Sequence, residues 1–105
     1  MENKPICEID KYGTKRWFIN GIRHREDGPA VEFLDGENHW YFNGKVHRLN
    51  GPALELFNGI KIWYINGFHV TDEITQWAKD NDIDLDNLAE EDKTLIKIVW
   101  GDHGK

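Results

Sequence analysis

The chain repeats one aromatic, glycine-rich pattern at a fixed spacing, and this repeat restricts its fold more than any other feature. The segments WFING, WYFNG and WYING begin at Trp17, Trp40 and Trp63, which are equally spaced along the chain. A glycine precedes each tryptophan by four residues, and the sequence H-R-x-D/N-G-P-A follows the first two segments. Because a period of this length is typical of stacked supersecondary units, we expect a repeat array.

Asn-Gly and Asp-Gly pairs separate the aromatic segments and predict β-hairpins. Such a pair between aromatic and β-branched residues favours a type I′ turn, in which both central residues need a positive φ. Five pairs occur, at 20–21, 35–36, 43–44, 58–59 and 66–67. They predict an antiparallel, sequentially ordered meander with strands near 15–19, 22–25, 30–34, 37–42, 45–48, 53–57, 60–65 and 68–70.

Two-residue turns also fix which residues face each other across a hairpin. The rule gives five pairs: Trp17 with His24, Trp40 with His47, Trp63 with Val70, Val31 with Trp40 and Leu54 with Trp63. One face of the sheet therefore collects the tryptophans and needs a cover, since a single twisted sheet exposes both of its faces.

From residue 71 the apolar spacing becomes helical, and two helices are expected to supply that cover. In the first, Ile74, Trp77 and Ala78 share one side, and Thr71 or Asp72 caps the start. The segment AEEDKTLIKIVW predicts the second, with acids in its first turn as the helix dipole favours. Its inward series is Asp92, Leu95, Ile96 and Val99. The residues expected to bury against the tryptophans are Trp77, Leu88, Leu95, Val99 and Trp100.

The predicted class is mainly β (α+β), an antiparallel meander of tandem 23-residue β-hairpin repeats capped by two C-terminal helices. The 105 residues suit a single domain over 1–105, with the hairpin repeats at 8–70 and an acidic helical cap at 71–100. Cys7 is the single cysteine, no apolar run is long enough to cross a bilayer, and MENKPICEID lacks the apolar stretch of a signal peptide. The expected location is cytoplasmic, with no membrane contact.

Charge is distributed unevenly along the chain. The net charge of -6 argues against direct nucleic-acid binding. Residues 71–92 alone contain nine acids and one lysine, for a net charge of -8. This segment therefore offers a surface for a basic protein partner, or else it only solubilises the helical cap.

The tandem pattern W-Y-x-N-G-x-x-H-R-x-x-G-P-A resembles the MORN-type repeat over about residues 8–70. The variant is that of bacterial antitoxin-like proteins and of small proteins of tailed bacteriophages and giant viruses. The resemblance implies a hairpin scaffold for protein or lipid contacts. The H-R-x-x-G-P-A extension is closer to the viral variant, the helices lie outside the repeat, and lipid binding does not carry over.

The repeated His-Arg pair is the first candidate for chemistry. His24 and His47 could serve as metal ligands or acid-base groups, aided by Arg25, Arg48, Asp27 and Glu26. Alternatively, each imidazole packs against its cross-strand tryptophan, and each arginine reaches an acid or a turn carbonyl. Repetition favours the structural interpretation, because an active site needs only one set of catalytic residues whereas a fold element recurs with each repeat. In addition, Val70 replaces the histidine in the third copy, which a packing position tolerates and a ligand position does not. Trp17, His24, Trp40, His47 and Trp63 are therefore interpreted as structural repeat residues.

A second candidate is DNDIDLDNLAEE at residues 80–91, which is spaced like an EF-hand loop. Its possible calcium ligands are Asp80, Asp82, Asp84 and Glu91. Leu85, however, occupies the position where the sharp turn of such a loop requires glycine. No metal site and no cofactor are therefore predicted.

The sequence predicts a non-enzymatic protein-binding module. The resemblance implies a phage-encoded accessory protein that inhibits a host or anti-phage defence factor, acting in the host cytoplasm. The alternatives are an antitoxin-like or regulatory bacterial protein and a calcium-binding protein. A free edge strand would also permit self-association. The partner-binding candidates are Asp80, Asp82, Asp84, Asp86, Glu90, Glu91, Asp92, Tyr41, Tyr64, Arg25 and Arg48.

Overall fold

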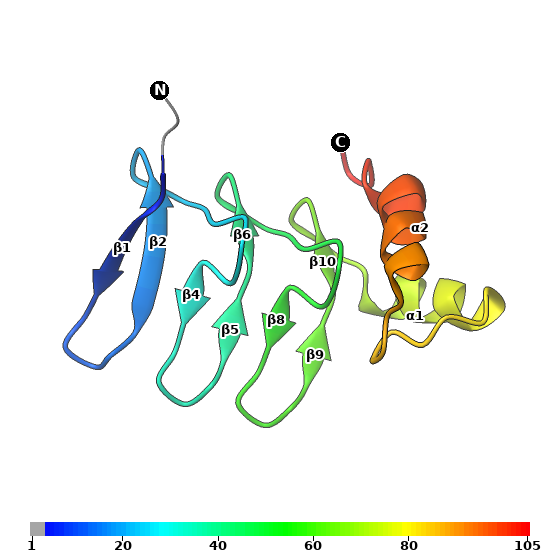
Figure 1. The fold of residues 1–105 in the computed structure, drawn as a ribbon, viewed down its shortest axis with the longest axis horizontal. Helices are drawn as coiled ribbons and strands as arrows, with labels where there is room; N and C mark the ends of the chain where they lie inside the picture. The colour runs from blue at the N-terminus through cyan, green and yellow to red at the C-terminus, as the bar shows by residue number, and fades with distance from the viewer. Residues whose placement is uncertain (1–3) are drawn as a thin grey trace.

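The chain forms a row of short antiparallel hairpins with two helices at one end. The computed structural model describes residues 4–105, so the first three residues of the expected domain lie outside the description. The helices α1 (Thr71–Asp80) and α2 (Glu90–Trp100) lie at the opposite end of the row from β1 (Figure 1). The strands are β1 (Ile6–Ile9), β2 (Lys15–Ile19), β3 (Ile22–Arg23), β4 (Val31–Glu32), β5 (Asn38–His39), β6 (Tyr41–Phe42), β7 (Lys45–Val46), β8 (Leu54–Glu55), β9 (Lys61–Ile62), β10 (Tyr64–Ile65) and β11 (Phe68–His69). The mainly β class with two C-terminal helices is confirmed.

The strands do not form one sequentially ordered sheet, so that prediction is wrong. The main sheet runs β1-β2-β4-β5-β8-β9 with β3 beside β2, while β6-β7 and β10-β11 are separate ribbons. The chain leaves the main sheet at Trp40, whose N–H donates to the Ala53 carbonyl at 2.8 Å and whose carbonyl accepts from the His47 N–H at 3.1 Å. At Trp40 the backbone therefore changes its pairing, from the main sheet on the N–H side to the β6-β7 ribbon on the carbonyl side.

The tight Asn-Gly turns match the prediction. Asn20, Asn43 and Asn66 have φ values of 51°, 49° and 51°. The glycine after each asparagine also has a positive φ, as type I′ turns require. The pairing Ile19↔Ile22 in the first hairpin follows from this geometry. The expected partnership of tryptophan and histidine holds as a backbone bond, since the His24 N–H donates to the Trp17 carbonyl at 3.1 Å.

The loops at 35–36 and 58–59 were assigned the wrong register. Val31 pairs with His39 instead of Trp40, and Leu54 pairs with Ile62 instead of Trp63. Here the loop has three residues, because the Phe33 N–H bonds to the Glu37 carbonyl at 2.9 Å and only the glycine has a positive φ. A three-residue loop with glycine in the left-handed position moves every later pair by one residue.

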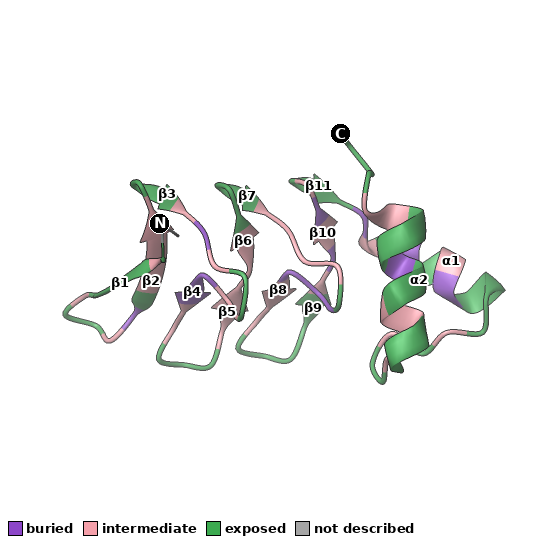
Figure 2. Ribbon diagram, turned by 45° about the horizontal axis from the view of Figure 1, so that its top comes forward, coloured by how far each residue is buried: buried purple, intermediate pink, exposed green. Residues whose placement is uncertain are grey.

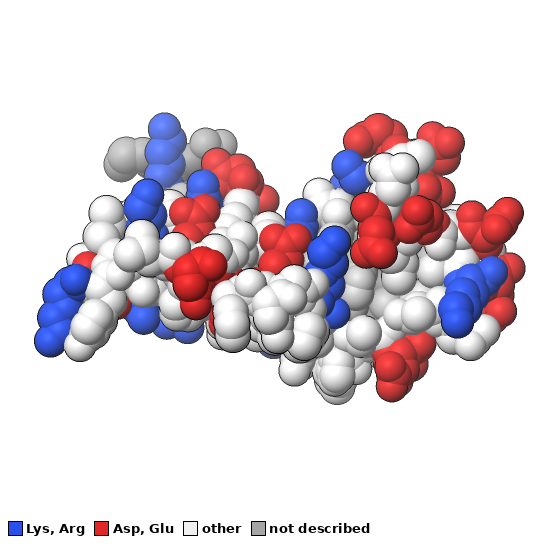
Figure 3. Space-filling view, turned by 90° about the horizontal axis from the view of Figure 1, so that it is seen from below, with Lys and Arg blue, Asp and Glu red and all other residues white. Residues whose placement is uncertain are grey.

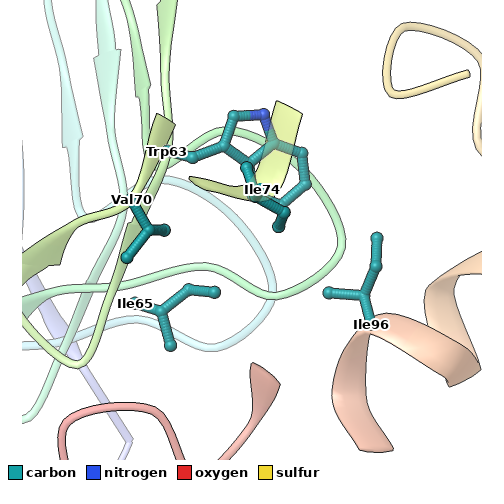
Figure 4. Close-up of a cluster of buried hydrophobic side chains, with 5 residues drawn as sticks. All are labelled: Trp63, Ile65, Val70, Ile74 and Ile96. Carbon is teal, nitrogen blue, oxygen red and sulfur yellow. The ribbon is translucent and has the colours of Figure 1, made fainter. Parts of the chain in front are cut away.

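The helices cap the end of the row and do not cover the tryptophan face, which corrects the expected packing. Trp63, Ile65, Val70, Ile74 and Ile96 form the buried cluster (Figure 4). The predicted inner residues Ile74 and Ala78 of α1 are buried, and Trp77, Leu88 and Trp100 pack partly buried against the cluster. Because α1 starts two residues after β11, the helices can reach only the last hairpin.

The predicted phase of α2 is partly wrong. Ile96 is fully buried, whereas Leu95 and Val99 are exposed. Most of the α2 ribbon is coloured as exposed or intermediate (Figure 2). The first turn of α2 contains Glu90, Glu91 and Asp92 as expected, and the Asp92 carboxylate accepts from the Ala89 N–H at 3.0 Å. The expected side-chain cap of α1 does not form within the described chain.

Candidate functional site

Each repeated histidine links its own hairpin to the next one. The Nδ1 atom of His24 accepts from the Asn43 N–H at 2.9 Å, and the Nδ1 atom of His47 accepts from the Asn66 N–H at 2.8 Å. Since an accepting ring nitrogen carries no proton, the neutral rings hold their proton on Nε2. The turn asparagine of the following hairpin therefore fixes the tautomer of both rings.

The histidine rings pack differently from the structural interpretation of the sequence. The His24 ring packs against Phe42, with ring centroids 4.6 Å apart, while the Trp17 ring is contacted by the Arg25 guanidinium. His24 is buried, and its Nε2 lies 3.6 Å from the Glu26 carboxylate. Both nitrogens of this ring thus face groups of the chain itself, which leaves little room for metal ligation.

The arginine after each histidine occupies the position over the tryptophan. The guanidinium of Arg25 lies 3.9 Å from the Trp17 ring centre, and that of Arg48 lies 3.8 Å from the Trp40 ring centre. Such a cation-π contact is favourable when it is partly shielded from water. The arginines therefore provide part of the cover that was expected from the helices.

The Gly-Pro pair completes this arginine site. Arg25 donates to the Pro29 carbonyl and Arg48 to the Pro52 carbonyl, both at 3.1 Å. A Cβ atom on Gly28 would lie 2.9 Å from the Arg25 Cζ, and one on Gly51 would lie 2.6 Å from the Arg48 Cζ. A side chain at either position would therefore force the guanidinium to shift, so glycine lets each arginine approach the backbone and accounts for the H-R-x-x-G-P spacing.

Arg25 has two acidic partners among the described residues, whereas Arg48 has one. Arg25 binds Asp27 at 2.9 Å and Glu32 at 3.4 Å, while Arg48 binds Glu55 at 3.6 Å. Asn50 replaces the aspartate, and the Arg48 Nε is buried without a hydrogen-bond partner among residues 4–105. Burial lowers the pKa of Arg48, and Glu55 partly opposes this.

Asn50→Asp is expected to stabilise the protein by about 1 kcal/mol, because it gives the buried Arg48 Nε the carboxylate that Arg25 already has. Asp27→Asn is the matched reverse change and should destabilise the first site. Urea unfolding of both variants measures the two effects. A loss of stability in Asn50→Asp would contradict this comparison of the two arginines.

The third copy ends the series with different groups. The Trp63 N–H donates to the Thr71 Oγ1 at 2.9 Å, where Trp17 and Trp40 use the carbonyls of Ala30 and Ala53. Val70 is buried in the helix-facing cluster. Because a helix and not another hairpin follows it, this position has no turn N–H to bind, so an apolar residue suits it better than histidine.

Stability should fall on mild acidification because of His47. Burial lowers its pKa, with a smaller contribution from Lys105. The unfolded chain, with a histidine pKa near about 6.5, therefore takes up the proton more readily than the folded state. This contribution to stability is present above that pH and is lost as the pH falls below it toward the lowered folded-state pKa.

Urea unfolding from about pH 7.5 down to about pH 5 checks this pH dependence. His47→Asn keeps an acceptor near the position of Nδ1 but does not titrate, so the decline with pH should become shallower. An unchanged slope in that variant would assign the pH dependence to another group.

Tyr41 and Tyr64, two of the partner-binding candidates, are half-buried. The Tyr41 carbonyl accepts from the Arg25 N–H, and Arg23 lies 5.1 Å from the Tyr41 ring centre. The Tyr64 ring stacks on His69 with centroids 5.1 Å apart. These side chains, like Arg25 and Arg48, are thus committed largely to contacts within the chain.

A groove of about 680 Å³ lies beside the second His-Arg segment. Trp40, His47, Arg48 and Asn50 line it together with Lys97 from α2. His47 and Arg48 are already bound to chain groups, so Lys97 is the lining cation best placed to meet a ligand there. The groove carries acids as well, Glu26 and Asp27 among them.

The acidic residues gather at the helical end, while acids and bases alternate along the strands (Figure 3). Several are locally bound: Asp86 lies 3.5 Å from the Lys61 Nζ, Glu90 pairs with Lys93 at 3.1 Å, and Asp80 accepts from Gln76 at 3.0 Å. Asp82 and Glu91 have no ion pair within the described part of the chain. These two carboxylates therefore remain open to a partner.

The carboxylates of the EF-hand-like segment are spread over different elements. Asp80 ends α1, Asp82 has a φ of 58°, and Glu91 lies in α2. Within residues 4–105, no three histidine, cysteine or carboxylate side chains come together to hold a metal ion. The candidates Asp80, Asp82, Asp84 and Glu91 are thus not assembled into a ligand set.

The sequence reasoning missed the exposed side of α2. Leu95 and Val99 were expected in the core, and the apolar pattern assigns no role to Ile98. Apolar residues lie so close together in LIKIVW that more than one side of the helix could face the core. The sequence alone therefore does not identify Ile96 as the buried residue. These exposed side chains are further candidates for contact with a partner.

None of the helices in the described part of the chain is both long and apolar enough to span a membrane. No family model, no curated protein and no solved structure matches this chain.

Proposed function

We propose that this chain is a non-enzymatic protein-binding module built on tandem 23-residue MORN-like hairpin repeats, and that its acidic helical end contacts a basic surface of a protein partner. The observation that carries the proposal is a contrast between the repeated side chains, which bind groups of their own chain, and acids at the helical end, which do not. His24, His47 and the two following arginines bind groups of their own chain. At the helical end, Asp82 and Glu91 have no ion pair within residues 4–105.

Recurring contacts support the repeat part of the proposal. The bond from Trp17 to Ala30 recurs as that from Trp40 to Ala53, and the bond from Asn43 to His24 recurs as that from Asn66 to His47. Stacked units of this kind hold their neighbours by equivalent contacts. A side chain used in each copy for this purpose is scaffold, and specificity then rests on the parts that do not repeat.

The acidic end suits electrostatic recognition of a basic surface. Residues 71–92 carry a net charge of -8 within a chain of net charge -6, so the rest of the chain is slightly positive. A concentrated negative charge accelerates the encounter with a positively charged protein surface and repels nucleic acid. A phage-encoded inhibitor of a host or defence factor, acting in the host cytoplasm, is the setting that the MORN-like resemblance suggests.

A pull-down from host lysate tests the acidic surface. The test variant carries Asp82→Asn and Asp84→Asn, which neutralise two acids of the helical end that have no ion pair within residues 4–105. The control carries Glu8→Gln and Asp35→Asn, two exposed acids of the strand region with the same change in charge. Capture of the partner should fall with the test variant and persist with the control. Equal capture by both variants would reject the acidic surface.

A further inference from the structure

Three apolar side chains of α2 are exposed to solvent on one side of the helix. The exposed fractions are 37% for Leu95, 75% for Ile98 and 50% for Val99. Residues spaced i, i+3 and i+4 lie next to each other on a helix surface. We call these three residues the α2 stripe. Neighbouring exposed apolar groups of this kind indicate an interaction site more strongly than isolated ones do.

Acidic residues lie at both ends of the α2 stripe. Glu91 precedes Leu95 by four residues, which places it on the same side of the helix. Asp102 follows three residues after Val99, just past the helix end, and its side chain is fully exposed with the Lys105 Nζ 3.8 Å away. The lysines of α2 are used elsewhere: Lys93 pairs with Glu90, and Lys97 lines the groove beside Arg48.

A second copy of the chain fits the α2 stripe poorly. In an antiparallel two-fold pair, the register that sets Leu95 opposite Ile98 of the other copy also sets Glu91 opposite its Asp102. Symmetry repeats this contact, so like charges face each other at both ends. Such juxtaposition of like charges disfavours the pairing. The charges favour a basic occupant instead.

We propose that the α2 stripe docks an amphipathic helix of a protein partner, with apolar residues on one side and lysine or arginine beside them. The leucine-like side chains would pack on Leu95, Ile98 and Val99, as ridges of one helix pack against another. The flanking cations would meet Glu91 and Asp102. This inference rests on the proposed function and deepens it, because it names the partner's contact element.

Two synthetic peptides of about 18 residues, long enough to form helices on binding, test the inference. Both carry leucines at i, i+3, i+4 and i+7. One has lysine at the remaining positions and the other has glutamate. Binding to the full chain is measured by fluorescence anisotropy. The lysine peptide should bind and the glutamate peptide should not.

Ile98→Ala is the test variant, since it removes the most exposed apolar side chain of the stripe and keeps a good helix former. It should weaken binding of the lysine peptide by about tenfold. Leu34→Ala is the matched control, because Leu34 is 82% exposed and lies in a hairpin loop away from the helices. The control should bind like the unaltered chain, and circular dichroism should show both variants folded.

Three outcomes would overturn the inference. Equal weakening, or none, in Ile98→Ala and Leu34→Ala would mean that charge alone attracts the peptide, which leaves the proposed acidic surface standing. Equal binding of both peptides would reject the role of Glu91 and Asp102. A dimer in sedimentation that Ile98→Ala dissociates would assign the stripe to a second copy. A different result would reject only the acidic surface of the proposed function: Ile98→Ala weakens peptide binding as expected, but neutralising Asp82 and Asp84 leaves partner capture unchanged.

Discussion

Replacing Ile96 with alanine is expected to lower the free energy of unfolding by about 2 to 5 kcal/mol, the range for truncating a buried isoleucine. Ile96 is fully buried and contacts the cluster that joins the helices to the last hairpin. Truncation leaves a cavity between α2 and the Trp63 region that the short helix cannot easily fill. Urea unfolding followed by tryptophan fluorescence measures the change.

Ile98→Ala is the matched control for this loss, since it alters the same residue type two positions along the same helix. The Ile98 side chain is 75% exposed. Its truncation should therefore change the free energy of unfolding by less than about 0.5 kcal/mol, as is usual for a surface position. Comparable losses in both variants, or the larger loss in Ile98→Ala, would show that α2 is packed in a different phase.

His24→Ala is the second change with a large expected effect. It removes the acceptor of the Asn43 N–H from a part-buried hydrogen bond, and losing such a bond costs about 1 kcal/mol. The lost contact with the Phe42 ring adds to this. The stability loss should appear in urea unfolding, and hydrogen exchange should become faster at the Asn43 amide in particular.

His24→Asn separates the hydrogen bond from the packing. The asparagine Oδ1 can occupy roughly the position of the imidazole Nδ1 and accept the same bond. We expect it to recover much of the stability and the slow exchange at Asn43. If His24→Asn and His24→Ala behaved alike, the bond to the next hairpin would not be what the histidine contributes.

The hairpins were predictable where the sequence allows only one turn geometry. At Asn20-Gly21 both residues must adopt positive φ, and both do. Asp35-Gly36 fits a two-residue turn equally well in sequence, but there only Gly36 is positive and Leu34 belongs to the loop. Dipeptide identity does not distinguish the two cases, so the register beyond them was wrong by one residue.

The repeat pattern in the sequence does not predict the contacts between successive hairpins. Repetition favours a structural role for His24, and the acceptor bond of its ring goes to the backbone of Asn43 in the next hairpin. Local spacing carries no information about such a bond. The stacking of Arg25 on Trp17 and its approach to Gly28 likewise depend on how one hairpin turns into the next.

The sequence predicts the two C-terminal helices, but not which part of the sheet they pack against. Because α1 starts two residues after β11, the helices can reach only the last hairpin. This restriction comes from the short connection between the two elements and not from the apolar pattern. In α2, Leu95, Ile96, Ile98 and Val99 are all apolar, so the side that faces the core depends on contact with Trp63 and its neighbours. The exposed α2 stripe is the result.

The claim that the repeated His-Arg residues are scaffold is tested most directly by the tautomers of His24 and His47. A long-range nitrogen–proton NMR correlation spectrum near neutral pH reports which ring nitrogen carries the proton. We predict that both rings are protonated on Nε2 and unprotonated on Nδ1, since each Nδ1 accepts from an asparagine N–H of the next hairpin. Protonation on Nδ1, or a ring that exchanges freely between tautomers, would contradict this account and return both histidines to the candidates for chemistry.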